Sequence, residues 1–261
     1  TEPAKIKNYE AALPHYEKLI KECPGYHIAI YQYGVKMFEY FVEEKGDKSK
    51  VNDLTHAWEL RLQNFPDQTK EGDVLSTIAQ IKYDNNIGSK AEQFKAFDEA
   101  FKKDPENFTS GKSLYAYFSL AVDLHNEGQK DLQDIFNLYD IVIDKIDAEK
   151  NSLASKLTPL MDKEEAGTAL TSKEQRAKDV YENNLGVYAT VEGSVNGKLG
   201  QLADCDNLIP LYNKDFENKK TGFYVLFEFK SKPNFIADLE TELTRDERIM
   251  RFLTVKLDEE A

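Results

Sequence analysis

Similar phrases that contain a proline recur along the N-terminal part of the chain. They are LIKECPGY (19–26), LQNFPDQ (62–68) and FKKDPENF (101–108), and their prolines lie 42 and 39 positions apart. In each, apolar residues at helical spacing run up to a proline, which cannot continue an α-helix because it lacks an amide hydrogen and its ring clashes with the preceding turn. The spacing predicts a series of helices that end at regular intervals.

Pairs of amphipathic segments lie between these prolines. Residues 26–45 and 49–64 form one pair around the turn KGDKSK, and residues 72–84 and 90–103 form the next around NNIGS. Each segment places apolar residues on one helical face. Because one αα-hairpin cannot bury such a face alone, we expect neighbouring hairpins to stack into a continuous core.

Two stretches strengthen this interpretation. AEQFKAFDEAFKKDPEN (91–107) and NYEAALPHYEKLIKECPG (8–25) resemble the second helix and the proline-containing turn of tetratricopeptide repeats. The chain departs from that pattern, because its repeat exceeds the usual length of about 34 residues. Pro14 also falls inside a predicted helix. The resemblance implies a divergent αα-hairpin solenoid that binds proteins.

Longer helices follow. We expect helices over 110–128, from about 130 to 163, and from the capping box Thr171–Glu174 to about residue 202, then one short final helix. The phrase GQLADCDNLIPLYNKDFE is similar to exported bacterial tetratricopeptide proteins. That resemblance covers about residues 5–219 and implies a place in the periplasm or cell envelope.

The tail has a different pattern. TGFYVLFEFK (221–230) alternates as a half-buried strand does, PNFIADLETELT (233–244) has helical periodicity, and MRFLTVKLD (250–258) is a second predicted strand. Residues 218–258, with the phrase RDERIMRFLTVKLD, resemble the second half of the bacterial ribosomal protein bS6 family. We therefore predict two domains, a helical solenoid over 1–219 and one βαβ unit over 220–261.

The resemblance implies half of a ferredoxin-like βαββαβ fold, and such a piece lacks the central strand between its two strands. A two-stranded piece of this kind should not be stable alone. Three explanations remain open. The chain is a chimera or composite, a partner supplies the missing half, or the tail packs on the last solenoid helices.

The charge, the apolar runs and the cysteines of the chain argue against several classes of function. The chain has 34 basic and 47 acidic residues, a net charge of −13, so long-range repulsion opposes nucleic acid and anionic membranes over most of its surface. No apolar run approaches the roughly 20 residues of a membrane span. Cys23 and Cys205, 182 positions apart, do not have zinc-site spacing, and whether they pair stays open.

No catalytic or metal-binding pattern was found. The histidines lie on separate segments, and GSVNGKLG (193–200) lacks the spacing, the Ser/Thr and the preceding strand that a phosphate-binding loop requires. The sequence therefore predicts a non-enzymatic protein without cofactor or metal.

The candidate protein-binding residues are tyrosines of the first helices of the hairpins, which line the concave face of a solenoid. They are Tyr31, Tyr33, Tyr40, Tyr115 and Tyr117. The alternative, that most of them pack between repeats, stays open. We expect a scaffold that binds an unidentified protein or peptide.

The bS6 resemblance carries an alternative function. It implies that Arg245, Arg248 and Arg251 contact 16S rRNA or the small protein bS18, and that the chain is associated with the small ribosomal subunit in the cytoplasm. The same arginines are interleaved with Asp246 and Glu247. Local ion pairing is therefore an equally good account of them.

Overall fold

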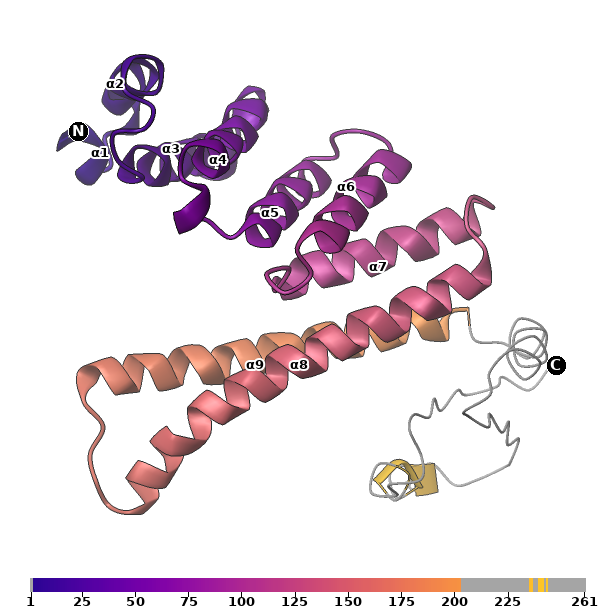
Figure 1. The fold of residues 1–261 in the computed structure, drawn as a ribbon. Coiled ribbons are helices and arrows are strands. Elements are labelled where there is room, and N and C mark those ends of the chain that lie inside the picture. The colour runs from indigo at the N-terminus through magenta and orange to yellow at the C-terminus, as the bar shows by residue number, and fades with distance from the viewer. Residues whose placement is uncertain (1, 203–234, 237–238, 242, 244–261) are drawn as a thin grey trace. The chain divides into compact units, whose positions relative to one another are not determined.

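The computed structural model describes residues 2–202, 235–236, 239–241 and 243. These residues are mainly α-helical and contain no β-strand, which confirms the predicted mainly α class for this part of the chain (Figure 1). The elements are α1 (Glu2–Lys5), α2 (Tyr9–Glu22), α3 (Ala29–Glu39), η1 (Tyr40–Glu44), η2 (Lys48–Lys50), α4 (Val51–Asn64), η3 (Pro66–Gln68), α5 (Glu71–Asp84), α6 (Lys90–Lys103), α7 (Gly111–Asn126), α8 (Leu132–Glu165) and α9 (Ser172–Gly200).

Helices that are consecutive in the chain pack against one another. Each helix from α1 to α7 contacts the next, and α5 also contacts α7. Figure 1 shows α5, α6 and α7 as short neighbouring helices, followed by the much longer α8 and α9. Apart from the last turn of α9, these elements belong to one compact unit that ends at Val195. The predicted αα-hairpins are therefore present.

The helices α2, α4 and α6 end in the same way. The residue before each proline leaves the helical region with similar dihedral angles, at Cys23 (φ −142°, ψ 54°), Phe65 (φ −137°, ψ 55°) and Asp104 (φ −149°, ψ 75°). Each still donates its backbone N–H to the carbonyl four residues earlier. The residue before a proline is disfavoured in the α conformation. The predicted helix ends are confirmed.

The first hairpin differs from the sequence expectation in one place. Residues 26–45 were expected as a single helical segment, but α3 ends at Glu39 and continues as a π-helical turn over Tyr40–Glu44. Lys45 there donates its N–H to the Tyr40 carbonyl at 3.0 Å. The Tyr40 ring packs 5.0 Å from that of Tyr9 on α2. Such a wider turn is common near functional sites, and it follows directly on the residues described below.

A close approach between α2 and α3 fixes the core of the first hairpins. A Cβ added to Gly34 would lie 2.3 Å from Cε2 of Tyr16, so any larger residue there would force the Tyr16 ring or the two helices to move. Tyr16 is buried, and this burial raises the pKa of its hydroxyl. The cluster around it comprises Ala4, Tyr9, Ala12, Tyr16, Val35, Met37, Phe38, Val42, Val51, Leu54 and Ala57.

Ion pairs join the long helices α8 and α9. Lys150 contacts Glu192 at 2.7 Å, and Lys163 contacts Glu174 at 2.8 Å. Thr171 and Glu174 form the predicted capping box, since the Thr171 N–H donates to the Glu174 carboxylate at 2.7 Å and the Glu174 N–H donates to the Thr171 hydroxyl at 3.3 Å. This prediction is confirmed.

The predicted tail is mostly outside the described residues. The described residues between 235 and 243 are helical, in the segment where a helix is predicted. Both predicted strands, the predicted short helix after residue 202 and the boundary at 219/220 lie outside the described residues. None of the described helices combines the length and apolar character that crossing a bilayer requires.

Candidate functional site

Two of the tyrosines proposed for binding lie in the core. Tyr31 is fully buried, and its hydroxyl donates to the Pro24 carbonyl at 3.1 Å. Tyr117 is 3% exposed, and its hydroxyl donates to Asp98 at 2.6 Å. Burial and this hydrogen bond raise the Tyr117 pKa. As placed, these two side chains stabilise helix packing and have no surface to offer a partner.

The other three, Tyr33, Tyr40 and Tyr115, are half-buried. Lys45 lies 5.4 Å from the centroid of the Tyr40 ring. Tyr33 lines a cleft, described next. The structure does not gather the five tyrosines into one surface, and protein binding by the half-buried ones stays a prediction.

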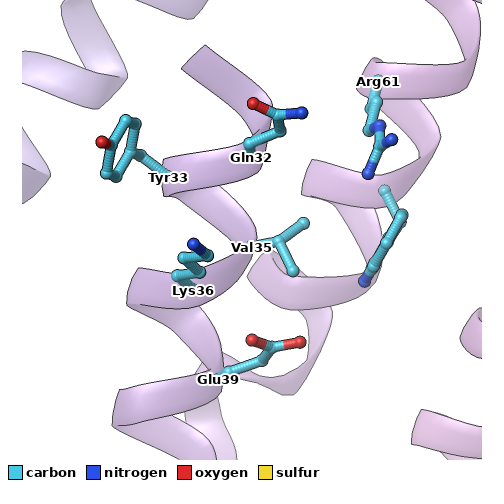
Figure 2. A pocket seen from close by; sticks show the side chains of 7 residues that line it. Gln32, Tyr33, Val35, Lys36, Glu39 and Arg61 are labelled. Carbon is cyan, nitrogen blue, oxygen red and sulfur yellow. The ribbon is translucent and has the colours of Figure 1, made fainter. Parts of the chain in front are cut away.

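A half-open cleft of about 420 Å³ lies between α3 and α4. Figure 2 shows Gln32, Val35 and Glu39 on the side of α3 that faces the helix carrying Arg61, with Tyr33 extending to the other side of α3. Its lining residues are Gln32, Tyr33, Val35, Lys36 and Glu39 from α3, and Trp58 and Arg61 from α4. Spacings of three and four residues put Gln32, Lys36 and Glu39 on one helical face, and Trp58 and Arg61 on another.

The cleft contains buried hydrogen-bond donors for which the described residues offer no acceptor. The indole Nε1 of Trp58 and the Nε of Arg61 are both buried, and neither has a hydrogen-bond partner in the part of the chain that the structure describes. A buried donor without a partner costs about 1–3 kcal/mol. Native proteins satisfy nearly all such groups. Two on adjacent turns of one helix are therefore a specific feature of this cleft.

The charges in the cleft are also unbalanced. Lys36 lies 5.9 Å from the centroid of the Tyr33 ring. Within 4 Å, neither Lys36 nor Arg61 forms an ion pair with any described residue. Glu39 is half-buried, and this burial raises its pKa, with a smaller contribution from Glu43 and an opposing one from Lys36. The cleft thus combines two cations with a carboxyl group whose charged form is disfavoured.

Sequence reasoning missed most of this site. Of its lining residues only Tyr33 was a candidate, and Trp58, Arg61, Lys36 and Glu39 were not singled out. An arginine three residues after the chain's single tryptophan is the local signal that could have pointed to α4. Its partner face on α3 depends on how the two helices pack, which the spacing within one helix does not reveal.

The other sequence candidates do not form a second site in the described residues. No group of three or more His, Cys, Asp or Glu side chains that could hold a metal ion was found there. His56 lies 3.3 Å from Glu59, and His125 contacts the Lys130 carbonyl at 2.8 Å. Cys23 is exposed. Cys205, Arg245, Arg248 and Arg251 lie outside the described residues.

Comparison with known proteins finds ribosomal relatives. The model of the ribosomal protein S6 family matches residues 175–256. The small ribosomal subunit protein bS6 of Flavobacterium johnsoniae is 57% identical over 47 residues, which cover 18% of this chain and 42% of that protein. The bS6 protein of Phocaeicola vulgatus is 53% identical over 45 residues, 17% of this chain and 40% of that protein.

The chain spans about two fifths of the length of these relatives. No solved structure matches it significantly. The predicted resemblance of the C-terminal region to bS6 is therefore confirmed. The family match begins inside α9, and from residue 175 to residue 200 the matched region is one continuous helix.

Proposed function

We propose that the helical body is a non-catalytic protein-binding module, and that it holds an extended segment of a partner in the cleft between α3 and α4. The observation that carries this proposal is the pair of buried N–H donors, Trp58 Nε1 and Arg61 Nε, without an acceptor in the described residues. A partner's oxygen atoms would supply the missing acceptors. The array of αα-hairpins supports the proposal, because stacked hairpins present extended binding surfaces.

The proposal is tested with purified full-length chain and a displayed library of random dodecapeptides. Peptides enriched on the wild-type chain are measured against Gln32→Trp, which fills the cleft from α3. The matched control is Gln175→Trp on the exposed surface of α9, outside the cleft. We expect the enriched peptides to lose roughly tenfold in affinity on the Gln32 variant, about 1.4 kcal/mol, and to bind the control unchanged.

Peptides that bind both variants equally would show that the cleft is not the binding site. A screen that enriches no peptide would contradict the proposed function itself. Circular dichroism of both variants establishes that they are folded before affinities are compared.

A second candidate function rests on the tail. Its match to the ribosomal protein S6 family over residues 175–256 favours association with the small ribosomal subunit, through 16S rRNA or bS18. The arginines Arg245, Arg248 and Arg251 are the proposed contacts. Sedimentation of the full chain with purified small subunits tests this. Replacing the three arginines with glutamine should release the chain from the particles, and a wild-type chain that stays in the supernatant would exclude this function.

The two segments also raise the question of a composite chain. We propose that the bS6-like tail and the helical body are separate functional parts, the body exported and the tail ribosomal in origin. Peptide mapping of natural material across NKDFENKKTGFYVLFEFK (213–230) tests this. A continuous peptide would establish a real fusion, and would direct attention to whatever supplies the missing central strand.

A further inference from the structure

We propose that the cleft between α3 and α4 recognises the carboxylate of a glutamate or aspartate side chain within an extended segment of a partner protein. Arg61 and Lys36 would bind the carboxylate, and Trp58 would supply an additional N–H donor and an apolar wall. This inference rests on the proposed function and specifies the chemistry of its ligand.

Charge complementarity carries the first step. The chain has a net charge of −13, and several lysines of the described helices, such as Lys90, Lys102 and Lys103, form ion pairs with carboxylates. Lys36 and Arg61 form none within 4 Å among described residues, although they line the same cleft. Two unpaired cations in an acidic protein favour an anionic group from outside.

Hydrogen-bond chemistry carries the second step. The donors of the cleft are N–H groups of Trp58, Arg61, Lys36 and Gln32. Lys36 and Gln32 are exposed to water, whereas Trp58 Nε1 and Arg61 Nε are buried without an acceptor among the described residues. Carboxylates accept bidentate hydrogen bonds from the planar guanidinium better than neutral carbonyl groups do. The Nε of Arg61 is buried, so a ligand oxygen reaches it only after the guanidinium rotates. The cation–π contact with Trp58 opposes this rotation, but no ion pair to a described residue does.

The third step concerns the amount of charge. Glu39 lines the same cleft, and burial already disfavours its charged form. A doubly charged phosphate would place two negative charges beside Glu39. A carboxylate places only one there, and Lys36 and Arg61 line the same cleft. A volume of about 420 Å³ is at the small end of ligand sites, and the cleft is half open. It therefore suits one acidic side chain with its flanking backbone passing outside.

The experiment uses the peptides from the screen above that bind the wild-type chain but lose affinity for Gln32→Trp. These cleft-directed dodecapeptides are resynthesised with acetylated N-termini and amidated C-termini. Trp58 is the only tryptophan of the chain, so its fluorescence reports binding at the cleft directly. Each acidic residue of a peptide is replaced by its amide, Glu by Gln and Asp by Asn. Affinities are measured on the full wild-type chain, on Arg61→Gln and Lys36→Gln, and on the control Arg176→Gln, an exposed arginine of α9.

We expect that converting one carboxylate of the peptide to the amide lowers its affinity roughly tenfold, both for the wild-type chain and for the Arg176→Gln control. On Arg61→Gln the difference between acid and amide should shrink to less than about threefold, because the charge-assisted bonds are absent in both. Lys36→Gln should reduce it by a smaller factor. Each variant is first checked for a wild-type circular dichroism spectrum.

Three results would overturn the inference while leaving the proposed function intact. In the first, replacing each acidic side chain of a cleft-directed peptide by its amide leaves the affinity unchanged. In the second, binding depends on a basic residue of the peptide that faces Glu39. In the third, binding is lost when the free C-terminal carboxylate of the peptide is amidated. If no cleft-directed peptide exists, the proposed function fails together with the inference.

Discussion

The guanidinium of Arg61 lies 5.1 Å from the centroid of the Trp58 ring, one helical turn away on α4. This cation–π contact is worth about 0.5–1 kcal/mol at an exposed site and more when water is excluded. It orders both side chains and leaves the Nε1 of Trp58 and the Nε of Arg61 without acceptors in the described structure.

Replacing Glu39 with glutamine should stabilise the fold at neutral pH. The folded-state pKa of Glu39 is raised, mainly by burial, so the folded state loses stability as rising pH ionises this group. Glutamine has no charge to bury. The melting temperature of Glu39→Gln should exceed that of wild type at pH 7, and the two should converge near pH 4. The control Glu44→Gln, at an exposed position, should show no such convergence.

Alanine at Gly34 should destabilise the protein. The added Cβ would lie 2.3 Å from the buried Tyr16 ring, so α2 and α3 must separate or the ring must move. Overpacking of this kind costs about 1–3 kcal/mol, measured by urea unfolding. Gly186→Ala on α9 is the matched control, because nothing lies within 4 Å of its Cβ position. That change should stabilise the protein by up to about 1 kcal/mol. Equal effects at both positions would contradict the close approach.

Stability should fall at alkaline pH. Burial raises the pKa of Tyr188 from 10.0 to about 12, and it raises the pKa values of Tyr16 and Tyr117 as well. Below pH 10 both states keep these protons and nothing is lost. Between pH 10 and pH 12 the unfolded state releases them first, so the free energy of unfolding decreases. Thermal melts from pH 8 to pH 12 test this.

The variant Tyr188→Phe tests whether the Tyr188 hydroxyl contributes to this loss of stability at alkaline pH. It removes one of the titrating groups together with the hydrogen bond that its hydroxyl donates to the Thr109 carbonyl. Its melting temperature should start lower and then decline less steeply above pH 10. Parallel curves for wild type and Tyr188→Phe would show that this hydroxyl does not contribute to the pH dependence.

Acid should weaken the junction of α8 and α9. The hydrogen bond from Lys163, together with those from Thr171, lowers the pKa of Glu174 from 4.5 to about 2. The stability from this carboxylate is present above about pH 4.5 and is lost as the pH falls toward 2. Lys163→Gln should move the Glu174 pKa up toward 4.5 in a carbon-detected NMR titration. Lys150→Gln, whose partner is Glu192, should leave it unchanged.

Local features made much of the helical body predictable. The helix ends at Cys23, Phe65 and Asp104 follow from the prolines, because a proline restricts the residue before it whatever the rest of the fold does. The capping box at Thr171 was equally readable, because its donors and acceptors lie within one turn. The bS6-like segment was recognisable because the phrase itself carries the resemblance.

The surface of the same helices was not predictable in this way. Tyr31 and Tyr33 are two positions apart on α3, yet the first is fully buried and the second lines a cleft. A helical period assigns each residue to a face, but it does not say which neighbouring helix covers that face. The π-helical turn after Glu39 shifts the register further, and nothing in the apolar spacing indicates it.

The sequence by itself therefore determined where α2, α4 and α6 end and where α9 begins, since prolines and caps act within a few residues. Only the tertiary structure decided which side chains face one another. It brought Lys36 and Glu39 of α3 into the same cleft as Trp58 and Arg61 of α4, and within the described part of the chain it left two of their donors without an acceptor. The physical reason is that burial and unpaired charge depend on the packing of α3 against α4, which is set by contacts distant in the sequence.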